Sequence, residues 1–224
     1  MTHVAKAILQ RRSIRVYSQQ SVPEQTVAQL LLNAGQSASG SNLQPWKVYA
    51  LTGEAKDALI NTVADRAMTN PRGEAGGIPI YPDQMDPIYL QRRNACAELM
   101  YQALQIPRED KVARLQQIFK NFQFFGAPVG LIITMDRKME GSQLLDCGIF
   151  LQSIMLLAEE QGLATCPQAS WCMWPDTINE VLGLDPQEVV VAGLSLGYAE
   201  PDAAVNQIHQ PRQPAKQYIS LRGF

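Results

Sequence analysis

Histidine is nearly absent from this sequence, and its absence limits the chemistry available. The 224 residues include two histidines, His3 and His209, near opposite ends of the chain. A zinc-protease helix needs two histidines one turn apart, and a Ser-His-Asp triad needs one beside its nucleophile. The sequence therefore argues against both kinds of site, and we expect no bound metal.

Cysteine is also scarce and shows no ligand spacing. The four cysteines are Cys96, Cys147, Cys166 and Cys172, and none of them forms a CxxC pair. This excludes a zinc ribbon and a thioredoxin-like redox motif. Free thiols in a chain of this size are typical of a reducing compartment, so we expect a cytoplasmic protein with buried, inert thiols.

Long hydrophobic runs and glycine-rich nucleotide motifs are missing as well. The longest apolar stretches, such as residues 189–194, are too short to span a bilayer. The first residues lack the apolar segment of a signal peptide. No GxGxxG follows a predicted strand, and no GxxxxGK[ST] occurs. We expect no membrane association, and neither a Rossmann-type dinucleotide site nor a P-loop.

Charge is small overall but unevenly distributed. The chain has 19 basic and 21 acidic residues, a net charge of −2, which is less basic than is usual for a nucleic-acid-binding domain. Residues 1–23 and 203–224 hold seven basic residues and no acidic one, so residues 24–202 carry −9. The ends are either two solvated tails or two sources of cations for one anion, such as a phosphate. Neither interpretation predicts an extended nucleic-acid groove.

Hydrophobic periodicity predicts one α+β domain that spans residues 1–224. Polar and small residues mark 36–45 as a loop, and seven prolines and glycines mark 69–87 as irregular backbone. The pattern predicts helices at 3–11, 23–35, 54–68, 88–104, 108–120, 142–161 and 175–183, and strands at 46–51, 129–134 and 188–196.

The helix expected at 142–161 is apolar on nearly all sides. Leucine, isoleucine, methionine and phenylalanine recur along it without a continuous polar face. A helix of this kind must be buried all round. It is either the central helix of the core or part of a subunit interface, and these two interpretations are compatible.

Two polar segments are candidates for ligand binding. Residues 11–15 read Arg-Arg-Ser-Ile-Arg and end the first helix, although basic residues often end helices for electrostatic reasons alone. Residues 38–46 offer small hydroxyls, free backbone N–H groups and two side-chain amides. An aromatic heterocycle with an imide edge needs that mixture, but an ordinary polar loop has it too.

Taken together, several segments resemble the FMN-dependent nitroreductase family. They occur in order and span most of the chain, with the weakest match over 65–118. They are Gln10–Tyr17 (QRRSIRVY), Ser39–Trp46 (SGSNLQPW), Asn121–Pro128 (NFQFFGAP), Gly162–Gln168 (GLATCPQ), Gly193–Tyr198 (GLSLGY) and Pro211-Arg212.

The resemblance implies an α+β fold with a central mixed sheet flanked by helices. It also implies an intertwined homodimer with two FMN sites at its interface. The phosphate and ribityl chain would be held by Arg11, Arg12, Ser13, Arg15 and Arg212. The partner subunit would contribute Ser39, Gly40, Ser41, Asn42 and Gln44. Gln168 and Ala169 would lie at the reactive edge of the flavin, and Asn121 near its ring.

The resemblance further implies an oxidoreductase with ping-pong kinetics. NAD(P)H would give a hydride to flavin N5 and leave, and a nitroaromatic or quinone-like acceptor would then take its place. The resemblance assigns no catalytic side chain, because flavin N5 itself carries the hydride. Two alternatives remain on the same fold, a reductive dehalogenase and a flavin-fragmenting enzyme. A third is a flavin-binding module without turnover.

Residues 69–120 are expected to form a lid insertion that selects the acceptor. Proline and glycine are dense at its start, and helical patterns with aromatic side chains follow. The expected substrate-binding residues are Tyr89, Tyr101 and Phe124. The alternative is a surface insertion that only packs against the core.

Overall fold

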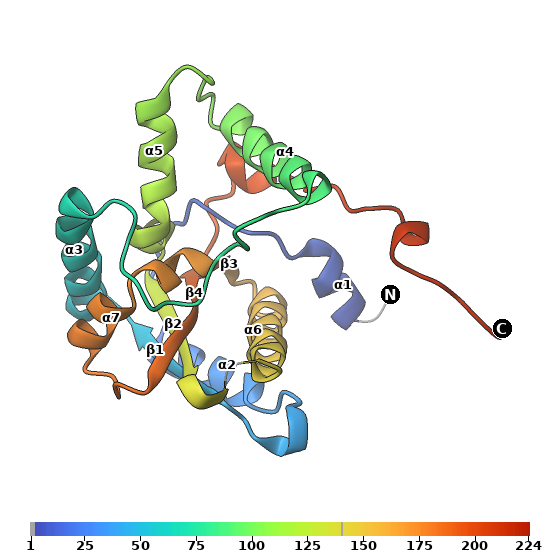
Figure 1. Ribbon diagram of the computed structural model, residues 1–224, viewed down its shortest axis with the longest axis horizontal. Coiled ribbons are helices and arrows are strands. Elements are labelled where there is room, and N and C mark those ends of the chain that lie inside the picture. Colours follow the sequence, from blue (N-terminus) through green and yellow to red (C-terminus); the bar gives the residue numbers. More distant parts are fainter. Residues whose placement is uncertain (1–2, 140) are drawn as a thin grey trace.

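A four-stranded antiparallel sheet lies at the centre of the computed structural model, which describes residues 3–139 and 141–224 (Figure 1). The strand order is β1 (Trp46–Leu51), β2 (Val129–Asp136), β4 (Glu188–Gly197) and β3 (Ala164–Gln168). Each neighbouring pair is antiparallel. The expectation of a mixed sheet is therefore wrong for these four strands. Among the described residues, parallel pairing occurs at one isolated bridge, between Ser13 and Thr165 of β3.

Strand β2 is buried on both faces, as its unbroken apolar sequence predicts. Val129, Leu131 and Ile133 pack into a cluster with the helices α2 (Glu24–Ala34) and α6 (Gln143–Glu160). Ile132 points the other way, into a cluster with α3 (Gly53–Thr69) and α7 (Pro175–Leu182). Successive side chains of a strand alternate between faces, so one strand supplies both halves of the core.

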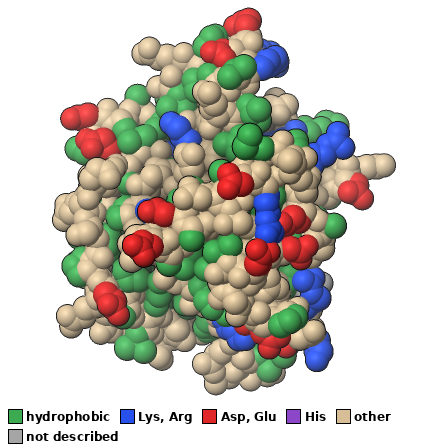
Figure 2. All heavy atoms as spheres, turned by 90° about the vertical axis from the view of Figure 1, so that its left-hand side faces the viewer, with side chains coloured by type: hydrophobic (Ala, Val, Ile, Leu, Met, Phe, Trp, Pro, Cys, Tyr) green, Lys and Arg blue, Asp and Glu red, His purple; other side chains and the backbone are tan. Residues whose placement is uncertain are grey.

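The remaining helices lie outside these two layers. Helix α1 (His3–Gln10) contacts α6, whereas α4 (Pro87–Ala103) and α5 (Lys111–Phe119) project from one end of the molecule (Figure 1). Figure 2 shows the face that carries α3 and α7, where acidic and basic side chains are interspersed and basic ones form no continuous band. No helix among the described residues has the length and apolar character needed to cross a membrane.

Helix α6 is only partly buried within one chain. Phe150, Ile154 and Ala158 are enclosed by the core, which confirms burial of that side. On the other side, Leu145 is 69% exposed and Ile149 is 37% exposed. The expectation of burial all round is therefore not met within a single chain.

The segment between α3 and α4 is irregular, as expected, but its first part is anchored. The Glu74 carboxylate accepts hydrogen bonds from the backbone N–H groups of Asp176 and Thr177, at 2.9 and 3.0 Å, at the start of α7. The backbone N–H of Glu74 also donates to the Met173 carbonyl at 2.7 Å. At Gly77 a Cβ atom would lie 1.9 Å from the Cys172 carbonyl oxygen, so only glycine permits this approach.

Candidate cofactor site

The segment that follows α1 is hydrogen-bonded to β3 and to the residue after β4. The Ile14 N–H donates to the Thr165 carbonyl of β3 at 2.9 Å. The Ser18 N–H donates to the Tyr198 carbonyl, just beyond β4, also at 2.9 Å. These backbone bonds fix residues 13–18, so the side chains of Ser13 and Arg15 project from a defined backbone.

A buried asparagine fastens the C-terminal part of the chain to this segment. Asn206 is 3% exposed, and its Oδ1 accepts from the N–H groups of Arg15 and Val16 at 2.9 and 3.2 Å. Its Nδ2 donates to the carbonyls of Val16 and Glu200 at 2.8 and 3.0 Å. Sequence reasoning missed Asn206, because an isolated asparagine in a polar tail gives no signal of its own.

This arrangement brings basic residues from both ends of the chain to one cavity of about 100 Å³, which we call the arginine pocket. It is lined by Arg11, Arg12, Ser13, Arg15, Cys96, Ile208, Gln210 and Arg212. Five of these were expected from the sequence to bind one phosphate-bearing ligand. The interpretation of the basic ends as sources of cations for a single site is therefore supported by their placement.

The positive charge of the arginine pocket is not neutralised. Within the described part of the chain, none of its four arginines forms an ion pair with a carboxylate. Arg15 donates to the Ser13 carbonyl at 3.2 Å, and Arg212 donates to the Gln210 carbonyl at 3.1 Å. Both contacts orient a guanidinium group while leaving its charge available, which suits a phosphate.

Two cysteines lie at this site in opposite environments. Burial raises the pKa of the Cys166 thiol to about 11, although the nearby Arg15 and Ser13 act in the other direction. Cys147 and Cys172 are likewise buried, so these three fit the expectation of buried thiols. Cys96 does not, because it is exposed and lines the arginine pocket. Cys96 lies on α4, a helix with few buried side chains. The sequence pattern of that helix did not reveal that Cys96 is exposed.

A second cavity, of about 390 Å³, lies between α6 and the sheet, and we call it the α6 cavity. Gln168 and Ala169 line it at the end of β3, together with Ile133, Leu144, Cys147, Gly148, Leu151, Pro167, Val191 and Ala192. The lining is mostly apolar, as suits a planar aromatic group.

The Gln168 side chain is committed to the protein. It is 2% exposed, its Nε2 donates to the Asn121 carbonyl at 2.5 Å, and its Oε1 accepts from the Ser195 hydroxyl at 2.8 Å. The Asn121 side chain donates to the Ile118 carbonyl at 2.8 Å. The Gln168 amide is therefore hydrogen-bonded at both its nitrogen and its oxygen, whereas the Asn121 side chain uses one of its two N–H groups. The resemblance placed Gln168 at the reactive edge of the flavin, which stays a prediction; it gave no sign that the Gln168 side chain joins β3, β4 and residue 121.

Ser195 needs separate mention because residues 193–197 read Gly-Leu-Ser-Leu-Gly, the letter pattern of a hydrolase nucleophile elbow. Here the pentapeptide lies inside β4 and Ser195 is completely buried. An elbow requires a serine exposed on a sharp turn between a strand and a helix. The pattern therefore carries no hydrolase chemistry.

The polar loop expected to bind the flavin lies elsewhere in the same chain. It forms a short 3₁₀ turn, η1 (Gly40–Asn42), near the first turn of α6, where the Gly40 N–H donates to the Asp146 carboxylate at 3.1 Å (Figure 1). Ser41, Asn42 and Gln44 have φ values of 50°, 58° and 47°, which are costly for residues with a Cβ atom. None of the residues 39–44 lines the arginine pocket or the α6 cavity.

The three expected substrate-binding residues have different environments. Tyr89 is 55% exposed on α4 and remains available. Phe124 is fully buried, because its ring lies flat over Gly130 and stacks on Trp171 at 4.5 Å. Tyr101 is buried under the Arg114 guanidinium, 4.1 Å from its ring. The side chains of Phe124 and Tyr101 are part of the packing in this structure, and their roles as substrate contacts stay predictions.

Comparison with known proteins identifies the family of this chain. Residues 8–198 match the Nitroreductase family, and the chain belongs to that family. It is 36% identical to the 4-nitrobenzoate reductase of Pseudomonas putida, over 97% of this chain and 94% of that one. It is also 36% identical to the nitrobenzene nitroreductase of Ectopseudomonas oleovorans, over 96% and 94%.

Among solved structures, a similar one is the FMN and NADPH-dependent nitroreductase NfnB from sphigopyxis sp. strain HMH. The two chains superpose with a TM-score of 0.96 at 36% identity, and the match covers 99% of each.

Proposed function

We propose that this protein is an FMN-dependent NAD(P)H oxidoreductase that reduces nitroaromatic or quinone-like acceptors. The observation that carries the proposal is the arginine pocket, where Arg11, Arg12, Arg15 and Arg212 gather without a carboxylate partner in the described chain. Four guanidinium groups around a small cavity need an anion of high charge, and a phosphate monoester supplies it.

The residues present fit FMN. Arg11, Arg12, Ser13 and Arg212 would hold the phosphate, and Gln168 and Ala169 border the mostly apolar α6 cavity. When bound, FMN supplies the hydride chemistry that no side chain here can perform. The chain itself binds and orients the flavin and excludes water from it. Cys166 stays protonated at neutral pH because its pKa is about 11, so it does not compete as a nucleophile.

The functional unit is a homodimer in which residues 39–44 reach the flavin of the partner subunit. Three features support this assembly. The loop lines neither of the two cavities of its own chain, α6 has an exposed apolar stripe at Leu145 and Ile149, and α1 exposes Val4, Ile8 and Leu9. The C-terminal segment leaves the body of the molecule with Tyr218, Leu221 and Phe224 exposed, as in an arm that packs on a second copy (Figure 1).

The acceptor class follows from the relatives. Two of them are named for 4-nitrobenzoate and nitrobenzene, and each aligns over nearly the whole of this chain. We infer a small aromatic acceptor for this protein as well, which enters the site after the nicotinamide has left. The protein acts in the cytoplasm, where NAD(P)H is available and free thiols stay reduced.

A spectroscopic experiment tests the proposal. The purified protein is expected to be yellow, to lose its colour anaerobically with NADPH or NADH, and to regain it on addition of 4-nitrobenzoate or a quinone. Initial rates at several concentrations of both substrates are expected to give parallel double-reciprocal lines, because donor and acceptor occupy one site in turn.

Other outcomes contradict the proposal in distinguishable ways. A protein that binds no flavin excludes every flavin-based reading. A yellow protein that no nicotinamide coenzyme bleaches is a binding module, and one reoxidised by halogenated phenols but by no nitroaromatic or quinone is a dehalogenase. Degradation of the flavin during turnover identifies a flavin-fragmenting enzyme.

A further inference from the structure

The start of α4 carries an exposed surface of paired arginine and tyrosine side chains. The Arg93 guanidinium lies 5.3 Å from the ring centre of Tyr81, and the Arg92 guanidinium lies 5.7 Å from that of Tyr89. Tyr81 is 53% exposed, and both arginines are exposed. An exposed arginine beside an exposed aromatic ring offers a cation and a stacking surface to a ligand that has both a ring and a negative charge.

Neither arginine is neutralised by a carboxylate. Over residues 3–139 and 141–224, no ion pair involves Arg92 or Arg93. Asp83 and Asp86 are the acidic residues of the adjoining loop, and both are exposed to solvent. Arg92 donates to the side chain of Gln213 at 2.5 Å, a neutral partner that holds it in place.

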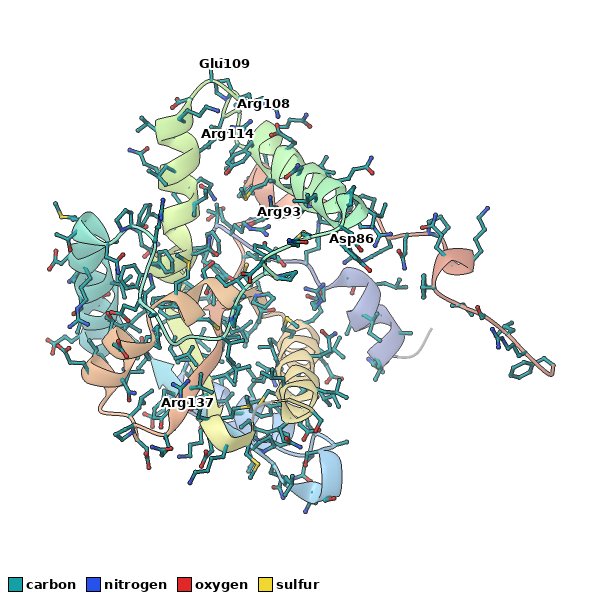
Figure 3. The ribbon with its side chains drawn as sticks, in the orientation of Figure 1. Asp86, Arg93, Arg108, Glu109, Arg114 and Arg137 are labelled. Atoms are coloured by element: carbon teal, nitrogen blue, oxygen red, sulfur yellow. The ribbon has the colours of Figure 1, made fainter. Side chains whose placement is uncertain are left out.

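This surface adjoins the arginine pocket. Cys96 lines that pocket and follows Arg92 and Arg93 by four and three residues, so all three lie on one side of α4. One helical turn, about 5.4 Å, therefore separates the surface from the pocket wall. Figure 3 shows Arg93 near the end of α4 where Asp86 lies, far from Arg108 and Glu109 at the turn between α4 and α5.

We propose that Arg92 and Arg93, with Tyr81 beside them, bind the 2′-phosphate end of NADPH and so make the enzyme select NADPH over NADH. The inference rests on the proposed function, since it assumes a nicotinamide coenzyme as the donor. The two coenzymes differ only in the 2′-phosphate, and an arginine pair is a suitable reader of that group. The exposed ring of Tyr81 offers a stacking surface for the adenine.

Coenzyme kinetics with the flavin-loaded enzyme test this assignment. Arg93→Gln is expected to raise KM for NADPH about tenfold, the loss typical of one charge-assisted hydrogen bond. Its KM for NADH and its kcat with either coenzyme are expected to stay within about twofold, because a neutral ribose makes no such bond. Arg93→Lys is expected to restore part of the NADPH affinity. Arg108→Gln, which removes an exposed charge at the far end of α4, is the matched control.

Binding of coenzyme fragments provides a readout that does not depend on turnover. Calorimetry with the holoenzyme is expected to show tighter binding of 2′,5′-ADP than of 5′-AMP, and Arg93→Gln is expected to abolish the difference. Equal binding of the two fragments by the unsubstituted enzyme overturns the inference, as does an equal change of both KM values in Arg93→Gln.

Failure of the underlying function looks different. In that case the unsubstituted protein holds no flavin, or neither coenzyme bleaches it, before any variant is made. Since this part of α4 is exposed, Arg93→Gln is expected to keep its fold, and its flavin content and circular dichroism verify this.

Discussion

Glu188 is a single residue that joins three strands. Its carboxylate, 5% exposed at the start of β4, accepts hydrogen bonds from Lys47 at 2.7 Å, from Tyr49 at 2.9 and 3.0 Å, and from Thr134 at 2.5 Å. Burial disfavours its ionised form, but these donors outweigh burial and lower the pKa of Glu188. The ionised carboxylate therefore stabilises the edge strand β1 against the middle of the sheet.

Glu188→Gln is expected to lower the free energy of unfolding by about 1–3 kcal/mol at neutral pH, the usual range for losing charge-assisted hydrogen bonds. Because the pKa is lowered in the folded state, this stabilisation is present above the ordinary carboxyl pKa and disappears as pH falls through the folded value. Urea unfolding of both proteins over a pH series measures the difference. Glu109→Gln, at an exposed turn, is the control, and a difference that grows with acidity contradicts this account.

The sequence was least able to predict whether a given side chain faces a cavity or is buried in the core. The uneven charge of the two ends left two interpretations open, and the family resemblance assigned these arginines to a phosphate; the structure brings Arg11, Arg12, Arg15 and Arg212 to one cavity. Phe124 and Tyr101 gave no comparable signal. Whether an aromatic ring faces a ligand or the core depends on partners such as Gly130 and Arg114, which only the folded chain brings near.

At the level of elements, periodicity was enough for most helices and three strands. The predicted strand at 46–51 coincides with β1, and the predicted helix at 142–161 differs from α6 by one residue at each end. Strand β3 was missed as a strand, because it has only five residues and includes Pro167. Its position is fixed by pairing with β4, a non-local contact that local pattern cannot reveal.

If residues 69–120 contain a lid, the part that can move is α4 and α5 rather than the start of the segment. Glu74 fastens the segment 70–77 to the first turn of α7, and Gly77 packs closely against Cys172 before that helix, so this part is not free to open. Helices α4 and α5 project from the body and carry the exposed Tyr89 (Figure 1). If the insertion selects acceptors, Tyr89 is the aromatic residue among those expected that remains available to touch them.

Tyr89→Ala is therefore expected to change the ratio of rates with a nitroaromatic and a quinone by about 2- to 10-fold, as expected for loss of one aromatic contact. Flavin content and the rate of bleaching by NADH, which lacks the 2′-phosphate, are expected to persist. Stopped-flow measurement of the two half-reactions separates these effects, with Val112→Ala on α5 as the control. Equal slowing with every acceptor argues that the insertion only packs against the core.

On the scale of the whole molecule, we propose that the flavin site is shared between two chains. Residues 39–44 line neither the arginine pocket nor the α6 cavity, although Gly40 is hydrogen-bonded to Asp146 of α6. The exposed stripe on α6, at Leu145 and Ile149, offers a surface on which two copies can meet. The sequence suggested this only through the apolar character of residues 142–161 and the family resemblance. A contact between two chains can be recognised in the sequence only as an apolar helix face such as this one.

Leu145→Asp is expected to produce a monomer that loses FMN, because a charge buried in an apolar interface is strongly unfavourable. Light scattering and the flavin absorbance of the purified protein measure the two effects. Leu115→Asp, at a similarly exposed leucine on α5, is expected to leave both unchanged. A Leu145→Asp protein that stays dimeric, or a monomer that keeps its FMN, is incompatible with a site shared between subunits.

The central claim is that arginines from both ends of the chain hold the phosphate of FMN. Titration of the apoprotein with FMN and with riboflavin, which lacks the phosphate, tests it most directly. We predict that Arg212→Ala weakens FMN binding by about 10- to 150-fold, the range for charge-assisted hydrogen bonds, and leaves riboflavin binding unchanged. Arg222→Ala, in the tail outside the arginine pocket, is expected to change neither. An unaltered FMN affinity in Arg212→Ala, or an equal loss for FMN and riboflavin, would contradict the claim.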